Sequence, residues 1–411
     1  MEIRPIFSAL MRNKTGPLLV AIQVALSLAI LANALHIVNV RQAVSARSSG
    51  IEAESDIVFI NVNSLKGGSH EEQLALQKAQ AAALRAVPGV VSVARVNQYP
   101  MSQAGNYNSV TTSRSQLKKV AVSSLYVSAD SLVKTWGLNV VEGRDFTPAD
   151  VWEVDESVSR DYPQTIMITR ALGQKMWPEA TSYVGKTFYF GKGETGRAVT
   201  VTGVVERLQT PNAAVGPEGE YSSIAPVRNT GYGSSRFAIR AEAGQRERVS
   251  KEAEEALRKL ENNQVVIETT TADEQRSQRY RADHALAWML ITVSVLLLLV
   301  TASGVVGMAS LWVTQRRKQI GVRRALGARR LDILRYFITE NVMITSTGVV
   351  SGLLGALALN HLLVSKFQME RLPASYLLAG AALFWLLGIA AVYGPAWRAA
   401  SISPALATRS A

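Results

Sequence analysis

Apolar residues gather in four long runs along this chain, and the sequence between the runs is mixed or polar. The runs cover residues 17–40, 285–313, 342–364 and 376–397. A helix needs about 20 predominantly apolar residues to cross the hydrocarbon core of a bilayer, and each run reaches that length. The pattern therefore predicts four transmembrane helices, which place both chain ends on the same side of the membrane.

The first run has a second interpretation. Lys14, the apolar residues after it and Ala32-Asn33-Ala34 together resemble a signal peptide with its cleavage site. The run continues past that point to residue 40, which is long for the hydrophobic region of a signal peptide. We favour an uncleaved first helix. In both interpretations the segment that follows, residues 41–284, is exported.

The distribution of charge predicts the orientation. The chain has 44 Lys and Arg and 32 Asp and Glu, of which residues 41–284 hold 29 and 28. Nearly all of the net charge of +12 therefore lies beside the apolar runs. Basic residues next to spans mark the cytoplasmic side, so residues 1–16, 314–341 and 398–411 are predicted to be cytoplasmic. A nucleic-acid-binding protein would concentrate its charge on one soluble domain, and no nucleic acid partner is expected.

The exported segment has the pattern of a mixed α+β domain. Residues 56–63 and 90–96 have the composition of strands, and an amphipathic helix capped by Ser69 lies between them. The same order of strand, helix and strand returns between residues 236 and 267. The segment has no cysteine, but about 240 residues are enough to bury a core without disulfides.

Two strand–helix–strand units in one domain predict a ferredoxin-like α+β sandwich, here formed by residues 50–98 and 236–272. Residues 99–235 contain short β runs, with turn signals at 191–193 and 231–233, and are predicted to form an inserted β-rich subdomain. The predicted fold class is an α+β membrane protein with four transmembrane helices and this exported domain between the first and second. Residues 273–283 are helical in composition and would join the domain rigidly to the second span.

Catalytic and metal sites are not expected. Residues 181–187 end like a phosphate-binding loop, but Ala180 stands where the first glycine is required, and the aromatic residues 188–190 predict a strand instead of a helix. The four histidines have no carboxylate or thiol at metal-ligand spacing, and no Gly-x-Ser-x-Gly motif is present. We therefore expect a non-catalytic chain without a bound cofactor or metal.

Small residues recur at helix-packing spacing in two predicted spans. Gly348, Gly352 and Gly355 follow one another at about one turn in the third span, and Ser303 and Gly307 are four apart in the second. Such spacing lets helices approach closely. The neighbouring helix would belong either to the same chain or to a second subunit.

Residues 316–330, between the second and third spans, carry the strongest signal for function. They read Arg-Arg-Lys-Gln-Ile-Gly-Val-Arg-Arg-Ala-Leu-Gly-Ala-Arg-Arg. Basic residues alone would set the orientation. The glycines and alanines spaced among them are typical of a short helix that packs closely on a partner. The segment therefore predicts a cytoplasmic docking site.

These motifs resemble those of the MacB/FtsX-like permeases of ABC transporters. In that class the loop after the second span typically reads Glu-Ile-Gly-x-Arg-x-Ala-x-Gly-Ala, which residues 319–328 match except that Gln319 replaces the usual Glu. The class pattern Pro-Ala-x-x-Ala-x-x-x-x-Pro is matched by residues 395–404, and residues 143–146 and 203–205 resemble its exported-domain signatures.

The resemblance implies a MacB-type permease without a fused ATPase domain, in the bacterial inner membrane. Such a permease pairs with a second permease subunit, and a cytoplasmic ABC ATPase, which binds the ATP, docks beneath the pair. ATP-driven closure then moves the exported domains, a mechanism called mechanotransmission. A periplasmic adaptor, an outer-membrane channel and membrane lipid are further implied partners. The residues implied in coupling to the ATPase are Gln319, Ile320, Gly321, Arg323, Ala325, Gly327 and Ala328.

Two other functions of this class stay open at this point. One is transmembrane signalling that regulates a cell-wall hydrolase, and the other is release of lipoproteins from the membrane. The size and two-part organisation of residues 41–284 favour efflux of a periplasmic or outer-leaflet substrate.

Overall fold

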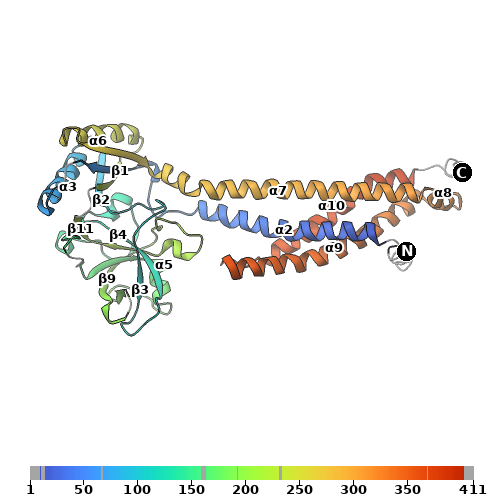
Figure 1. The fold of residues 1–411 in the computed structure, drawn as a ribbon, viewed down its shortest axis with the longest axis horizontal. Coiled ribbons are helices and arrows are strands. Elements are labelled where there is room, and N and C mark those ends of the chain that lie inside the picture. Colours follow the sequence, from blue (N-terminus) through green and yellow to red (C-terminus); the bar gives the residue numbers. More distant parts are fainter. Residues whose placement is uncertain are drawn as a thin grey trace. The chain divides into compact units, whose positions relative to one another are not determined.

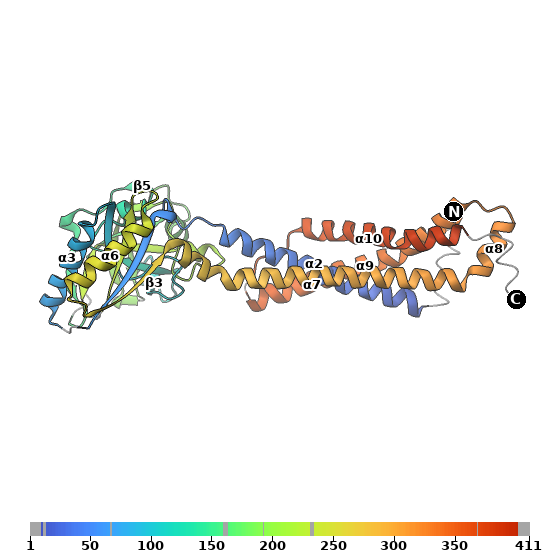
Figure 2. The same cartoon turned by 90° about the horizontal axis from the view of Figure 1, so that it is seen from above.

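The structure is a computed structural model that describes Leu10 and residues 14–65, 68–158, 163–191, 193–230, 234–367 and 369–401. The predicted cytoplasmic ends lie largely outside these ranges, and the turn predicted at 231–233 lies wholly outside them. The chain divides into two compact units (Figure 1, Figure 2). We call Met1–Ala43 with Asp283–Ala411 the membrane unit, and Val44–Ala282 the β-rich unit.

Among the described residues, four helices are long and apolar enough to cross a membrane, as the four apolar runs predicted. Each is longer than its run, because polar residues extend it at one or both ends. Residues 273–283 continue the second of these helices without a break, as their composition predicted. The helices are α2 (Thr15–Ser45), α7 (Ala272–Gln315), α9 (Arg330–Phe367) and α10 (Ala374–Ala400), and a short helix, α8 (Arg317–Ala325), lies between α7 and α9.

Helix α2 supplies much of the core of the membrane unit. Val24 and Leu28 are buried in the same apolar cluster as residues of α7, α9 and α10. Lipid offers no hydrogen-bond partner, and two polar side chains of α2 find one on α7. Ser27 and Thr301 share a hydrogen bond of 2.8 Å, and Gln23 donates to the carbonyl of Val300 at 3.0 Å. These bonds join α2 to α7 in addition to the apolar packing.

The β-rich unit contains a four-stranded antiparallel sheet in the order β13-β1-β12-β2. With α3 after β1 and α6 after β12, this is the strand order of a ferredoxin-like sandwich. Ser69 caps α3 in a reciprocal capping box with Glu72, as its position predicted. The elements are β1 (Ile57–Ser64), α3 (His70–Arg85), β2 (Val90–Val96), β12 (Ser234–Ala241), α6 (Arg246–Leu260) and β13 (Val265–Thr271).

Both faces of this sheet are buried. Ile60 and Phe237 pack in the cluster that includes Leu84 of α3 and Leu257 of α6. Phe59 belongs to the opposite face, in a cluster that includes side chains of the inserted strands. A strand buried on both faces reads as a continuous apolar run instead of an alternating one. The run Ile-Val-Phe-Ile that begins β1 has this composition.

The insertion forms a seven-stranded sheet in the order β5-β9-β7-β10-β4-β3-β8, and β8 also pairs with β9, so that six strands close into a ring. Closure removes two exposed sheet edges. The strands are β3 (Tyr107–Thr111), β4 (Ala121–Val127), β5 (Val140–Gly143), β7 (Thr165–Thr169), β8 (Thr187–Phe190), β9 (Arg197–Val205) and β10 (Ser222–Ala225). The remaining elements are η1 (Glu54–Asp56), α4 (Leu132–Trp136), η2 (Pro148–Asp150), β6 (Trp152–Asp155), α5 (Arg170–Met176), η3 (Gly193–Thr195), η4 (Pro217–Glu220) and β11 (Val227–Thr230).

Inside the β-rich unit, Arg276 of α7 joins the end of α2 to η1. Its guanidinium donates to the carbonyls of Ser45 at 3.0 Å and Arg47 at 2.9 Å and forms an ion pair with Glu54. Burial alone would raise the pKa of Glu54. Hydrogen bonds from Arg276 and Ser49, with the charge of Arg276, outweigh burial and hold that pKa below its ordinary value.

This ion pair predicts a stability difference that depends on pH. Because the pKa of Glu54 is lower in the folded state, its contribution is present above the unfolded carboxyl pKa of about 4.3 and is lost as the pH falls through the folded value. Thermal unfolding of the wild-type protein and of a Glu54→Gln variant, measured from neutral pH downwards, checks this. The wild type should be the more stable at neutral pH, and the gap should narrow in acid; a gap of constant size contradicts the assignment.

Candidate functional site

One face of helix α8 packs against α9 and α10. Ile320 is only 4% exposed and belongs to the same apolar cluster as Ile333 and Phe337 of α9 and Ala396 of α10. Gly321 beside it is also buried. Two of the residues predicted to take part in coupling to an ATPase are therefore covered by other parts of the same chain. Their position indicates that they hold α8 in place.

Polar contacts add to this packing at the start of α8. Arg316 donates two hydrogen bonds to the carboxylate of Glu340, at 2.9 and 2.8 Å, and Glu340 is 1% exposed. Arg323 lies over the ring of Tyr336 at 5.1 Å. Both bonds come from Nη1 of Arg316, and such charge-assisted contacts are stronger than neutral hydrogen bonds. The segment between α7 and α9 is therefore held in one orientation.

Gly327 forms the turn between α8 and α9. Its φ of +98° lies in the left-handed region, where glycine is favoured because it has no Cβ. No atom lies within 4 Å of an added Cβ among the described residues, so the backbone conformation and not packing favours glycine here. Ala328 follows half-buried, and the N–H of Arg329 donates to Asp332 at 2.9 Å as α9 begins.

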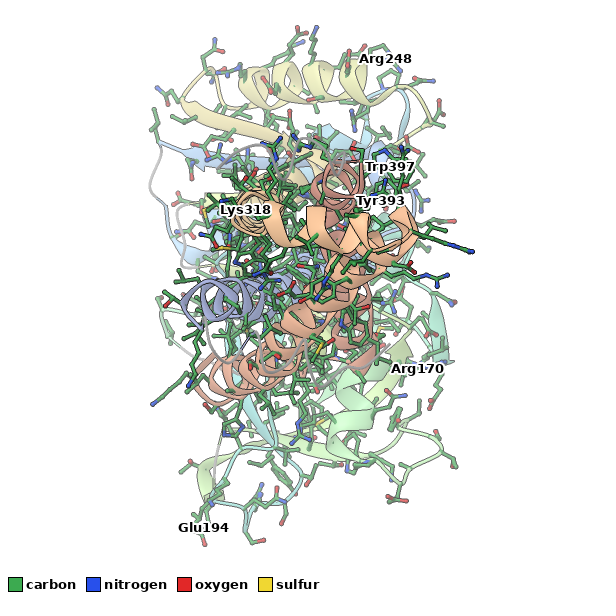
Figure 3. All side chains as sticks on the ribbon, turned by 90° about the vertical axis from the view of Figure 1, so that its right-hand side faces the viewer. Arg170, Glu194, Arg248, Lys318, Tyr393 and Trp397 are labelled. Atoms are coloured by element: carbon green, nitrogen blue, oxygen red, sulfur yellow. The ribbon has the colours of Figure 1, made fainter. Side chains whose placement is uncertain are left out.

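The opposite face of α8 is exposed. It carries Gln319, Arg323 and Ala325 from the predicted set, and Lys318, which Figure 3 labels on this helix. Residues 316–330 contain seven Lys and Arg and no Asp or Glu. This face can therefore offer cations to a partner with acidic groups.

Two apolar side chains on the exposed face were missed by the sequence reasoning. Val322 is 51% exposed and Leu326 is 83% exposed. They are four residues apart, which places them on one side of a helix. That spacing was visible in the sequence, but which apolar residues of the segment are buried was not. Exposed apolar groups within a basic rim are typical of a docking site.

The predicted helix-packing residues fall into two groups. An added Cβ on Gly348 would lie 2.8 Å from the carbonyl oxygen of Ala21, and one on Gly352 would lie 2.9 Å from that of Ala25, so α9 approaches α2 closely at these glycines. Gly355 is less constrained, since its added Cβ would lie 3.4 Å from the Cβ of Ala29, an ordinary van der Waals contact.

The second group, Ser303 and Gly307, is exposed, and an added Cβ on Gly307 meets nothing within 4 Å among the described residues. Of the two alternatives left open by the sequence, packing of this pair on a helix of the same chain is not seen among the described residues, and contact with a second subunit stays a prediction. Gly304 takes that place in α7, where an added Cβ would lie 2.5 Å from Gln23 of α2. The faces of a helix follow from its neighbours, and a spacing of four residues does not identify them.

Two family models match the chain. The FtsX-like permease C-terminal model matches residues 291–404, and the MacB-like periplasmic core domain model matches residues 24–256, more than half of the chain. The chain belongs to the MacB/FtsX-like permease family. It is thus a multi-pass membrane protein of an ABC transporter permease family, whose members are generally non-catalytic and work with ATPase partners. The FtsX-like match includes all of α8 and the glycines of α9.

Curated relatives agree with this assignment. The permease is 26% identical over 313 residues to the macrolide export ATP-binding/permease protein MacB of Chromobacterium violaceum, covering 73% of this chain and 46% of the relative. MacB of Agrobacterium fabrum is 29% identical over 72% of this chain and 44% of its own. The pyoverdine export protein PvdT of Pseudomonas syringae pv. tomato is 32% identical over 39% of this chain and 25% of its own. The permease thus spans less than half the length of these relatives.

Proposed function

We propose that this permease transmits the closure of a cytoplasmic ABC ATPase to movements of its β-rich unit on the outer side of the bacterial inner membrane. Two permease subunits, identical or related, would pair over two ATPase subunits. Both chain termini and α8 would be cytoplasmic. In this proposal the energy would come from ATP bound by an ABC ATPase, since members of the family work with ATPase partners.

The exposed face of α8 is the observation that carries this proposal. A helix held by Ile320 and by the Arg316–Glu340 pair presents Val322 and Leu326 within a rim of cations. A rigid helix with an apolar centre and a charged rim can both bind a groove and pass on a displacement. Gln319 replaces the usual Glu, so this position offers an amide to the partner instead of a charge.

Export of a periplasmic or outer-leaflet substrate is the proposed task. The four apolar runs contain no Asp, Glu, Lys or Arg that would line a polar path through the bilayer. Relatives named as macrolide and pyoverdine exporters support the same class of task. A periplasmic adaptor and an outer-membrane channel would then complete the route.

Co-purification tests the proposed function. The tagged permease is isolated from its native membranes after mild crosslinking, and its partners are identified by mass spectrometry. We expect an ABC ATPase together with an adaptor or an outer-membrane channel. The purified complex should hydrolyse ATP. A peptidoglycan hydrolase in place of the adaptor would instead support signalling, and absence of an ATPase contradicts the proposal.

The proposed orientation can be tested with single cysteines, because the chain has none of its own. Ser115 lies exposed in the β-rich unit and Gln319 is exposed on α8. In cells with a permeabilised outer membrane, an impermeant maleimide should label Ser115→Cys and not Gln319→Cys, and both should react after the inner membrane is opened. Labelling of Gln319→Cys in cells with a sealed inner membrane would mean that the orientation is the reverse of the one proposed. Ser222 is unsuitable as a site because it is buried.

A further inference from the structure

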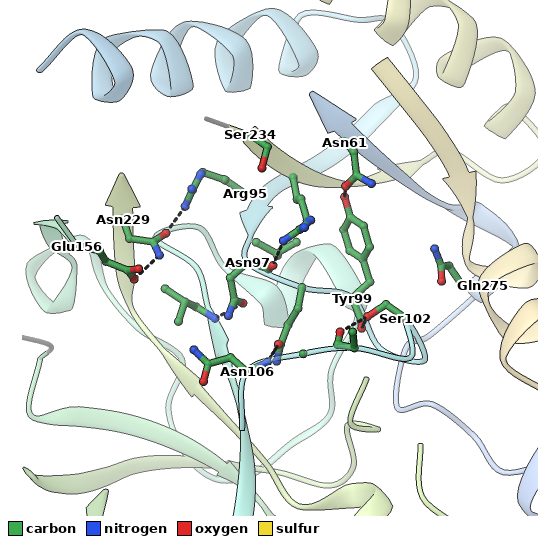
Figure 4. A pocket seen from close by; sticks show the side chains of 16 residues that line it. Asn61, Arg95, Asn97, Tyr99, Ser102, Asn106, Glu156, Asn229, Ser234 and Gln275 are labelled. Carbon is green, nitrogen blue, oxygen red and sulfur yellow. Dashed lines mark hydrogen bonds between the residues drawn. The ribbon is translucent and has the colours of Figure 1, made fainter. Parts of the chain in front are cut away.

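A cavity of about 600 Å³ lies inside the β-rich unit and is lined by residues of both sheets (Figure 4). Small-molecule sites typically have volumes of about 300–1,000 Å³, so a ligand of modest size would fit. Such sites are mostly lined by apolar and aromatic side chains. In this cavity amides, hydroxyls and two arginines predominate, with Tyr99 as the aromatic residue that Figure 4 labels. The lining is therefore suited to a polar ligand.

Arg95 is the most unusual group in this lining. It is 4% exposed, its Nη1 donates to Asn229 at 2.6 Å, and its Nε has no hydrogen-bond partner among the described residues. Burial and the nearby Arg228 lower the pKa of Arg95 to about 10, so the guanidinium is still charged at neutral pH. A buried charged donor without a partner is costly, and an acceptor that reached it would remove that cost.

The amide side chains around Arg95 are largely engaged in hydrogen bonds within the protein. Each of five amide oxygens in the lining already accepts a hydrogen bond from within the protein, at 2.5–2.9 Å. The nitrogens of Asn97, Gln98 and Asn229 also donate within the protein. The guanidinium groups are therefore the charged donors that the lining offers to a ligand. The amides are those of Asn61, Asn97, Gln98, Asn106 and Asn229.

The formal charges point the same way. Arg236 is exposed at the cavity and donates to the carbonyl of Asn97 at 2.6 Å. Glu156 is the carboxylate in the described lining, and it accepts from Asn229 at 2.6 Å. Two guanidinium groups thus face one carboxylate that is already hydrogen-bonded. Behind the lining, Asp130 accepts from the backbone N–H of Arg95 at 3.0 Å and forms an ion pair with Arg228. Within the lining itself, a negatively charged ligand would add a counter-charge for Arg236.

We propose that this cavity binds a small polar ligand that carries a carboxylate, which pairs with Arg95 and Arg236. Arginine suits this role because its planar fork matches the two oxygens of a carboxylate. The inference goes beyond the proposed coupling to an ATPase, since binding here needs neither the ATPase nor ATP. A largely apolar molecule would offer no partner to the charged groups of the lining.

Calorimetric titration of the full-length permease in detergent, without ATPase or nucleotide, tests the proposal. The probes are citrate, the blocked tripeptide acetyl-Ala-Glu-Ala-amide and its neutral counterpart with Gln. We expect at least one acidic probe to bind with a Kd below about 1 mM and the neutral peptide to bind at least about tenfold more weakly. Which of the two acidic probes binds more tightly distinguishes an organic acid from an acidic peptide as the class of ligand.

Variants locate the binding. Arg236→Gln, at an exposed position, should lower the affinity for the acidic probe roughly tenfold or more, because one charge-assisted contact is lost. Arg95→Lys should also lower this affinity, because the planar guanidinium is lost while the positive charge stays. Arg258→Gln, an exposed arginine of α6 outside the cavity, is the matched control and should bind as the wild type does. Absence of binding by both acidic probes, equal binding of the neutral peptide, or wild-type binding by Arg236→Gln overturns the proposal.

Discussion

The Leu326→Glu permease is expected to lose its ATPase partner while it keeps its own fold. Leu326 is 83% exposed, so the substitution disturbs no core packing within the chain. At an interface, however, it would bury a carboxylate in place of an apolar group, and such central positions commonly contribute about 2 kcal/mol or more to binding. Affinity for the ATPase should therefore fall by roughly 30-fold or more. Recovery of ATPase with the tagged permease, measured at equal permease amounts, checks this.

Leu117→Glu is the matched control for that experiment. Leu117 is 80% exposed in the β-rich unit, so the change in side chain and exposure is nearly the same. It should leave ATPase recovery unchanged. Val322→Glu, on the same side of α8 as Leu326, should repeat the loss to a smaller extent because Val322 is less exposed. Full ATPase recovery with both α8 variants would show that this face is not the docking site.

Gly352→Leu is expected to destabilise the membrane unit. An added Cβ would lie 2.9 Å from the carbonyl oxygen and 3.0 Å from the Cα of Ala25, and neither backbone atom can move without moving α2. Overpacking of this kind costs about 1–3 kcal/mol and sometimes more, which corresponds to a fall of several degrees in melting temperature. Thermal unfolding of the purified permease in detergent measures the effect.

Gly307→Leu serves as its control, because nothing described in the chain lies within 4 Å of an added Cβ there. Its melting temperature should match the wild type. If the exposed face with Ser303 and Gly307 contacts a second permease subunit, the same variant should lower the dimer fraction in size-exclusion chromatography with light scattering. Equal melting temperatures of Gly352→Leu and the wild type would mean that α9 does not approach α2 as the structure has it.

Much of the fold was predictable because its signals are local. A run of apolar residues must lie in lipid or in a core, and Ser69 can cap a helix with no help from distant parts of the chain. The strands that sequence reasoning missed are short and include polar residues. The strand β10, Ser222–Ala225, is buried along its whole length although half of its residues are serines. Its place between β7 and β4 comes from pairing with segments distant in the sequence.

The candidate site, too, was predictable only in part. The small-residue and basic pattern of residues 316–330 located the segment, since the motif is continuous in the chain. The pattern did not separate Ile320, which is buried, from Leu326, which is exposed, because both are simply apolar residues. The cavity around Arg95 was not anticipated, because its lining comes from segments between Asn61 and Gln275 that meet only in the folded unit.

The sequence by itself determined that the chain has four membrane helices, an α+β unit between the first two, and a basic segment with the spacing of a docking helix. These properties depend on residue type and on short-range spacing, which a linear chain already contains. Only the tertiary structure decided which face of each helix is covered, that Gly304 and not Gly307 approaches α2, and that Arg95 is enclosed with an unpaired donor. Burial depends on which distant segments come into contact, and these contacts exist only once the chain has folded.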